Sequence, residues 1–169
     1  LTTGDGNVAV GTNAGLLIDA GEANICIGNR AGDGFDAENY NIFIGEDAGG
    51  GAINGADKCI AIGKAALDGA ITTDGTIAIG HDALGALTSG SGCTAVGFES
   101  IDANDEGLGL TAFGYQSLSA QTGATNGATA IGHRALHQNN ASITNDYSVA
   151  VGFESGDNQT SGYQNTFLG

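Results

Sequence analysis

The sequence contains no proline, methionine or tryptophan, and aromatic residues make up only 6% of its 169 residues. Basic residues are nearly missing as well. There are four of them against 19 acidic residues, and the formal net charge is −15. A chain this acidic repels phosphates, so nucleic acids and anionic membrane surfaces are not expected as partners. No signal peptide or transmembrane run is visible, so no membrane insertion is expected.

Cysteine is scarce, and its spacing fits no zinc or haem pattern. Cys59 and Cys93 lie at the same position of a repeat described below, two repeats apart. Stacked strands separated by ~4.8 Å would place these two residues ~10 Å apart, which is too far for a disulfide. The sequence therefore predicts that these residues and Cys26 are buried free thiols that behave as small apolar side chains.

The histidines do not suggest a metal site or a catalytic group. His81 and His133 share one repeat position but lie three repeats apart, ~14 Å in a stacked structure. No Ser-His-Asp or Cys-His arrangement stands out from the repeat, so we do not expect an enzyme. Asp102, Asn104 and Glu106 resemble the start of a calcium-binding loop, but position 113 is Phe where that loop needs Glu. No cofactor is expected.

Glycine, in contrast, is abundant, with 31 residues. Many belong to a repeat whose clearest copy is Thr76–Leu84: a small or polar residue, then a β-branched residue, alanine, an aliphatic residue and glycine. The motif glycine recurs with steps of 17, 17, 18, 17, 17, 17, 18, 20 and 17 residues. Ten copies at so regular a period indicate a stacked repeat architecture rather than low complexity. The motif glycines are Gly11, Gly28, Gly45, Gly63, Gly80, Gly97, Gly114, Gly132, Gly152 and Gly169.

Each copy has the pattern of a short β-strand, because β-branched residues alternate with a small residue just before the glycine. Connectors rich in Gly, Asp, Asn and Thr supply the turns, and no helical period is present. We therefore predict an all-β parallel solenoid of about ten coils of 17–20 residues, over residues 1–169 as a single array. The chain lacks a starting Met and stops on a motif glycine, and we interpret it as a segment of a longer fibre.

Side-chain alternation divides each strand between two faces. We expect the two large aliphatic positions of the motif to form the core of one chain. We expect the alanine between them to face other copies of the chain, because a thin coil buries little apolar area alone. The alternative is that alanine merely lines a tight single coil. The predicted core ladder is Ile25, Ile27, Ile42, Ile44, Ile60, Ile62, Ile77 and Ile79. The predicted subunit interface is Ala61, Ala78, Ala95, Ala112, Ala130 and Ala150.

Two further features vary around the motif. Phe98, Tyr115, His133 and Phe153 follow successive motif glycines and predict an aromatic ladder on one flank. Such a ladder would bind sugars or pack against a neighbouring subunit, and we favour packing. The longest connector contains the extra residues of the 20-residue step, and inserted loops on solenoids often bind partners. The candidate receptor contacts in it are His137, Asn139, Asn140, Asn145 and Tyr147.

The motif resembles a repeat of known fibres. Cys93–Ile101, Leu110–Leu118 and Ala128–Leu136 are similar to the repeat NTAVGYQAL of bacteriophage tail and virion fibre proteins. Ser148–Gly152 is similar to the SVAIG repeat in the heads of trimeric autotransporter adhesins, whose repeats are shorter. The resemblance implies a left-handed β-roll assembled as a homotrimer. The first three copies depart from it, with glycine where the family often has leucine, and Phe43 and Phe167 replace the small middle residue.

The expected function is therefore structural and adhesive: a trimeric fibre segment of a phage virion that contributes to host attachment. Its partners would be two further copies, other virion proteins and a cell-surface glycan or protein receptor. The first alternative is the head of a bacterial trimeric adhesin at the cell surface. The second is an ice-binding solenoid, which needs a flat ladder of Thr-x-Thr pairs. Thr94, Thr111 and Thr129 form only a partial column, which we expect to point toward the core. A polysaccharide lyase would need longer coils and an acid/base cluster in a cleft.

Overall fold

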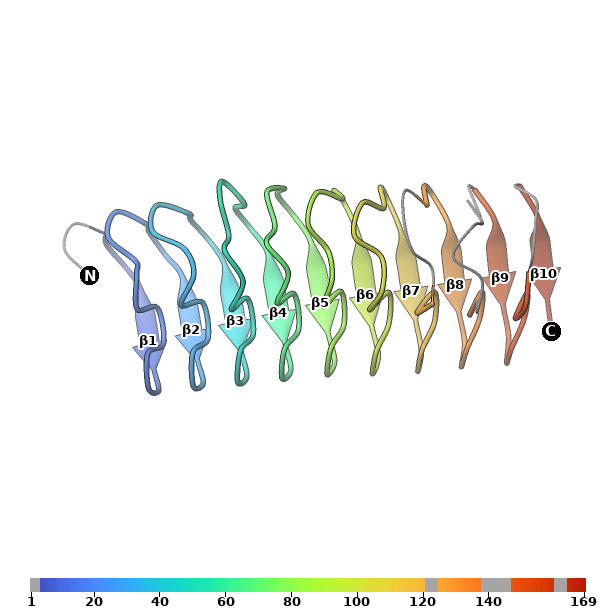
Figure 1. Cartoon of the computed structure of the whole chain (residues 1–169), viewed down its shortest axis with the longest axis horizontal. Coiled ribbons are helices and arrows are strands. Elements are labelled where there is room, and N and C mark those ends of the chain that lie inside the picture. Colours follow the sequence, from blue (N-terminus) through green and yellow to red (C-terminus); the bar gives the residue numbers. More distant parts are fainter. Residues whose placement is uncertain (1–3, 121–124, 138–146, 160–163) are drawn as a thin grey trace.

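The computed structural model describes residues 4–120, 125–137, 147–159 and 164–169. The described residues contain strands and turns but no helix. The strands stand side by side in one row along the long axis, and the two termini lie at opposite ends (Figure 1). The strands are β1 (Val8–Val10), β2 (Ile25–Ile27), β3 (Ile42–Ile44), β4 (Ile60–Ile62), β5 (Ile77–Ile79), β6 (Thr94–Val96), β7 (Thr111–Phe113), β8 (Thr129–Ile131), β9 (Val149–Val151) and β10 (Thr166–Leu168).

Each strand pairs in parallel with the next one along the chain, so the ten form a single sheet in sequence order. The register keeps equivalent motif residues opposite each other, for example Ile77 with Thr94 and Ala78 with Ala95. Every repeat therefore forms one coil and places its motif strand on the same wall. This arrangement confirms the predicted all-β parallel solenoid.

The motif glycines form a column at the end of the strands. Nine of the ten, all except Gly169, have φ between 132° and 143°, a conformation essentially restricted to glycine. A Cβ added at Gly80 would stand 2.6 Å from the carbonyl carbon of Gly97 in the next coil. Glycine is thus required at this position for two reasons: its backbone conformation and the close approach of the neighbouring coil.

The prediction of which side of the strand faces inward is wrong. The middle alanines Ala61, Ala78, Ala95, Ala112, Ala130 and Ala150 are fully buried within the single chain. The residues on either side of them, Ile25, Ile27, Ile42, Ile44, Ile60, Ile62, Ile77 and Ile79, lie on the outer face and are half-buried or exposed. The alanines line the interior of a tight coil, so they are not a subunit interface, and the isoleucines are not the core ladder.

Space inside the coil explains this inversion. The opposite wall contributes a leucine or isoleucine four residues after the motif glycine, and these side chains fill the interior. Leu84, for example, is fully buried in the coil that follows β5. The strand can then contribute only a small residue to the interior, so its larger side chains point outward. Thr94, Thr111 and Thr129 belong to the outer face too, and not to the core as expected.

In two places where this leucine is missing, a phenylalanine from a strand fills the interior. Gly49 stands where Leu84 stands two repeats later, and the ring of Phe43 fills the space, 2.7 Å from where a Cβ of Gly49 would lie. Phe167 is similarly close to Gly156, at 2.9 Å. The unusual Phe and Gly positions of the sequence are therefore matched pairs that conserve the packed volume across the interior.

Buried polar side chains reinforce the stacking at the N-terminal end. The Asn24 Oδ1 accepts a hydrogen bond from the backbone N–H of Asn41 (2.9 Å), and the Asn41 Oδ1 accepts one from the N–H of Cys59 (2.8 Å). The Asn24 amide also donates to the carbonyl of Glu38 (2.8 Å). These contacts satisfy polar groups that would otherwise be buried without partners. The two asparagines therefore connect successive coils without leaving polar groups unpaired.

Candidate functional site

The outer face of the sheet is an apolar surface that the described residues leave partly uncovered. It consists of the first and third residues of each strand, which are mostly Ile and Val, with Thr, Phe and Leu toward the C-terminal end. Exposed fractions on it range up to 78% at Leu168, and the chain's own connectors do not cover it. The large apolar residues of this face that are more than one-third exposed are Val8, Val10, Ile27, Phe113, Ile131, Val151 and Leu168.

An aromatic ladder borders this face, as the sequence predicts. Phe98 and Tyr115 stack with ring centroids 5.4 Å apart, and Tyr115 stacks on His133 at 5.0 Å. Phe153 extends the ladder at one end (4.9 Å from His133) and His81 at the other (5.1 Å from Phe98). The planes are within 14° of parallel, so the rings cover one another's faces and present mainly their edges to the outside.

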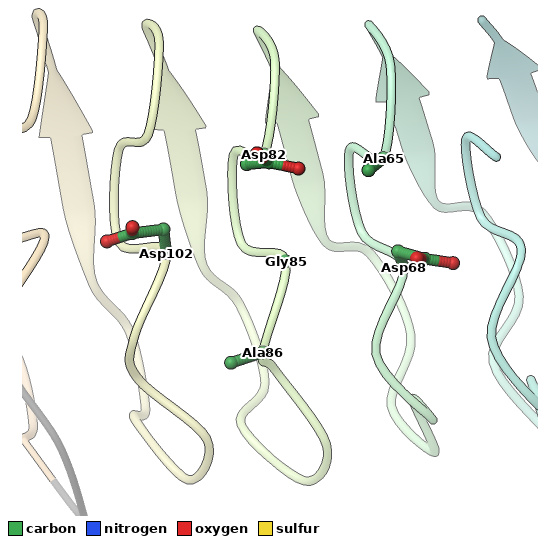
Figure 2. A pocket seen from close by; sticks show the side chains of 6 residues that line it. All are labelled: Ala65, Asp68, Asp82, Gly85, Ala86 and Asp102. Atoms are coloured by element: carbon green, nitrogen blue, oxygen red, sulfur yellow. The ribbon is translucent and has the colours of Figure 1, made fainter. Parts of the chain in front are cut away.

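Three aspartates on successive coils surround a shallow hollow of about 260 Å³, whose other lining residues are small (Figure 2). Burial and the nearby Glu99 raise the pKa of Asp102 to about 6, and burial with the nearby Asp47 raises the pKa of Asp68. The Oδ2 of Asp82 lies 2.8 Å from the Nδ1 of His81. In Figure 2 the carboxylate of Asp102 points to the opposite side from those of Asp68 and Asp82. Among the described residues, no three acidic, His or Cys side chains are placed to hold a metal ion.

One side-chain oxygen of the calcium-like loop is used within the chain. Asn104 is fully buried, and its Oδ1 accepts a hydrogen bond from the backbone N–H of Gly107 (2.5 Å). Glu106 is exposed on the surface. The side chain of Asn104 thus holds the connector turn.

The three cysteines are buried and free, as predicted. Burial raises the pKa of Cys26 to about 12 and also raises the pKa of Cys59 and Cys93. The Cys93 thiol donates a hydrogen bond to the carbonyl of Gly107 (3.1 Å). Thiols that stay protonated and inaccessible are poor nucleophiles, so these residues contribute packing rather than redox chemistry.

Two of the five candidate receptor residues are described. His137 is half-buried, and its Nδ1 lies 3.3 Å from the Oδ1 of Asp157 and 3.2 Å from the Nη2 of Arg134. Tyr147 is exposed at the edge of the solenoid, just before β9. The structure therefore places His137 in an internal polar cluster and Tyr147 at the surface. Asn139, Asn140 and Asn145 lie outside the described residues.

The isoleucine face is the apolar surface that the sequence interpretation misplaced. A signal for it exists in the sequence: in the fourth to eighth copies, where the middle strand residue is alanine, leucine or isoleucine stands four residues after the motif glycine, whereas glycine stands there in the third copy, where the middle residue is Phe43. This reciprocal variation means that the middle residue and the leucine share one interior. Large residues on both sides of the alanine must then face outward.

No helix among the described residues is long and apolar enough to cross a membrane. The comparisons with known proteins give no match for the chain, whether with family models, with curated proteins or with solved structures.

Proposed function

We propose that this chain is a structural and adhesive segment of a phage virion fibre, assembled as a parallel homotrimer of left-handed β-rolls. The observation that carries the proposal is the outer sheet face, an apolar surface that runs the length of the solenoid and stays uncovered in the single chain. Contiguous exposed apolar surface on a soluble protein marks an interaction site. The trimer and its handedness rest on the resemblance to fibre repeats.

Polar connectors restrict association to this face. Acidic residues are spread over the connectors and contribute to a net charge of −15, so the other sides of the rod repel one another. Three of the four basic residues form ion pairs with acidic neighbours, as in the bidentate contact of Arg30 with Asp47 (2.6 Å for both bonds). A partner copy therefore meets an apolar surface on one side and like charge elsewhere.

The direction of association follows from the difference between the two halves of the rod. After the motif glycine, the N-terminal repeats have polar residues such as Glu46 and Lys64, whereas later repeats have rings such as Phe98 and Tyr115. Antiparallel copies would place the aromatic ladder against the charged pair Glu46–Lys64 (3.3 Å). Parallel copies in register place each repeat beside its equivalent, which matches rings with rings.

Such an assembly is suited to attachment. Coils connected by a continuous parallel ladder form a stiff rod, and three identical chains present every surface contact three times. Weak contacts with a host surface then add through multivalency rather than through a single deep pocket.

Light scattering with size-exclusion chromatography tests the assembly. The expected mass is three times the 16.6 kDa of one chain. Ile131→Lys, on the outer face, should yield monomers that retain the β circular-dichroism spectrum. The matched control Ser89→Lys, on an exposed connector, should remain trimeric. A monomeric wild-type chain, or a trimer unaffected by Ile131→Lys, would contradict the proposal.

The head of a bacterial trimeric adhesin uses the same assembly, and sequence flanking the chain distinguishes the two: a membrane anchor and coiled-coil stalk, or virion-attachment segments. The outward position of Thr94, Thr111 and Thr129 favours ice binding more than the sequence indicated, because an ice-binding face must be flat and exposed. The second residue of each pair is Val96, Phe113 or Ile131 instead of Thr. Inhibition of ice recrystallisation by the chain, lost on replacing these threonines, would establish that function instead.

A further inference from the structure

The chain contains two Asn-Gly dipeptides, Asn54–Gly55 and Asn126–Gly127. An asparagine that precedes glycine can deamidate without an enzyme, because the unhindered backbone nitrogen of the glycine attacks the amide carbon of the side chain. Two features control this attack: room for the glycine backbone to adjust, and a group that takes the proton from its N–H. The two dipeptides differ in both respects.

Asn54–Gly55 lies in an open connector. Asn54 is exposed, Gly55 has φ 84°, and no atom lies within 4 Å of where a Cβ of Gly55 would stand. Gly127 instead has the ring of Tyr147 against it, with the Cδ1 atom 2.7 Å from its Cβ position. The backbone at Gly55 is thus free to adjust during the attack, whereas the backbone at Gly127 is covered.

The acceptor of the glycine N–H differs as well. The Gly55 N–H donates to the Oε1 of Glu38 (2.6 Å). The Gly127 N–H donates to the carbonyl of Leu108 (2.8 Å). A carboxylate takes up a proton far more readily than an amide carbonyl, so only the first contact supplies a base. Glu38 is buried, and its Oε2 accepts two further backbone N–H groups (3.0 and 3.1 Å), which hold the carboxylate in place.

Glu38 and Asn54 also line one hollow of about 330 Å³, together with the apolar side chains of Leu17, Phe35 and Ile53. A water molecule takes up about 30 Å³ in the liquid, so this hollow has room for the water that deamidation consumes. The carboxylate, the asparagine and water are therefore brought to one place.

We propose that Asn54–Gly55 is a self-modifying site at which Glu38 is the general base for deamidation. The Gly55 nitrogen forms a bond to the Cγ of Asn54, while its proton passes to the Oε1 of Glu38. The Cγ–Nδ2 bond breaks, and Nδ2 takes that proton and leaves as ammonia. Water then opens the succinimide at either carbonyl, which gives an aspartyl or an isoaspartyl linkage. The product adds a negative charge to a hollow that already contains Asp36 and Glu38.

Peptide mapping by mass spectrometry, during incubation of the 169-residue chain, measures the conversion at each asparagine. We expect Asn54 to convert about tenfold or more faster than Asn126, and Glu38→Gln to slow the conversion of Asn54 by about tenfold or more. The matched control Asp36→Asn removes an exposed carboxylate from the same hollow and should leave the rate unchanged. Loosening of the connector by Glu38→Gln would speed the reaction, so slowing identifies the loss of the base.

The pH profile of the rate provides a second measurement. Attack driven by hydroxide accelerates about tenfold for each unit of pH, whereas attack driven by the Glu38 carboxylate does not depend on hydroxide. The rate at Asn54 should therefore change little between about pH 5.5 and 7, and Glu38→Gln should restore the dependence on hydroxide. The inference is overturned if Asn54 and Asn126 convert at equal rates, if Glu38→Gln leaves the rate unchanged, or if the wild-type rate at Asn54 follows hydroxide.

Discussion

Replacing a motif glycine by alanine should be far more harmful than replacing a connector glycine in the same coil. The two positions are Gly80 and Gly75. At Gly80, φ is 136°, and a Cβ would collide with the carbonyl oxygen of Gly97. At Gly75, φ is 70°, and nothing lies within 4 Å of the added Cβ. Gly75→Ala therefore measures the backbone strain of an open site, whereas Gly80→Ala adds the contact with the next coil.

The magnitudes follow from the geometry. An alanine in the left-handed region costs about 1 kcal/mol at Gly75. At Gly80 the backbone region is essentially restricted to glycine and costs about 1–3 kcal/mol. The collision also separates the coils, which weakens the hydrogen bonds from the Gly97 N–H to the Ile79 carbonyl and from the Glu99 N–H to the His81 carbonyl (both 2.8 Å). At about 1 kcal/mol each, these raise the total to roughly 3–5 kcal/mol.

Urea unfolding followed by circular dichroism, at one fixed protein concentration because assembly contributes to stability, measures the difference. We expect Gly80→Ala to lower the free energy of unfolding by roughly 2–4 kcal/mol more than Gly75→Ala. Equal effects at the two positions would refute the conclusion that the motif glycines are required for close approach between coils.

Other predictions use the interior and the acidic hollow. Because the pKa of Asp102 is raised to about 6 from 3.8, its ionisation destabilises the fold as the pH rises between these values. Asp102→Asn should then raise the melting temperature at pH 7.5, by an amount equivalent to about 1 kcal/mol after allowance for its exposure, and leave it unchanged at pH 3.5. Ala65→Gly should stabilise by roughly 0.5–1 kcal/mol, because the φ of 53° at Ala65 is unfavourable for any residue other than glycine; unchanged urea midpoints would contradict this. Phe43→Ala should destabilise by about 3–5 kcal/mol, and adding Gly49→Leu should recover part of that loss in a double-mutant cycle, whereas additive destabilisation would disprove their shared volume.

Strand placement follows from the sequence because it depends on local features. Alternation, β-branched residues and the glycine at each strand end predict a three- to five-residue strand at each repeat, and the observed strands coincide with the motif. Register follows as well, since pairing Ile77 with Thr94 keeps equivalent residues together. The aromatic ladder is a direct consequence, because side chains at one repeat position stack when coils do.

The inside and outside of each strand could not be assigned from the strand itself. An Ile-Ala-Ile pattern has two faces, and hydrophobicity alone favours placing the larger residues inside. The decision depends on the opposite wall, where Leu84 already occupies the interior of its coil. Side-chain volume across the coil is a non-local quantity, and only the covariation of Phe43 with Gly49 reveals it in a single sequence.

The corrected orientation also explains how the residue types at the outward strand positions and after the motif glycine change along the chain. In β2 to β5 both outward positions of the strand are isoleucine, and the residue after the glycine is polar in β2 to β4. In β6 to β8 the first outward residue becomes threonine, while the residue after the glycine becomes Phe98, Tyr115 or His133. The apolar surface thus keeps a similar width, but along the rod its position shifts from the first residue of the strand toward the residue after the motif glycine. In the proposed trimer, a neighbouring copy that follows the apolar columns must cross the rod axis obliquely, so the sequence variation on the outer face sets the angle between subunits while the interior stays constant.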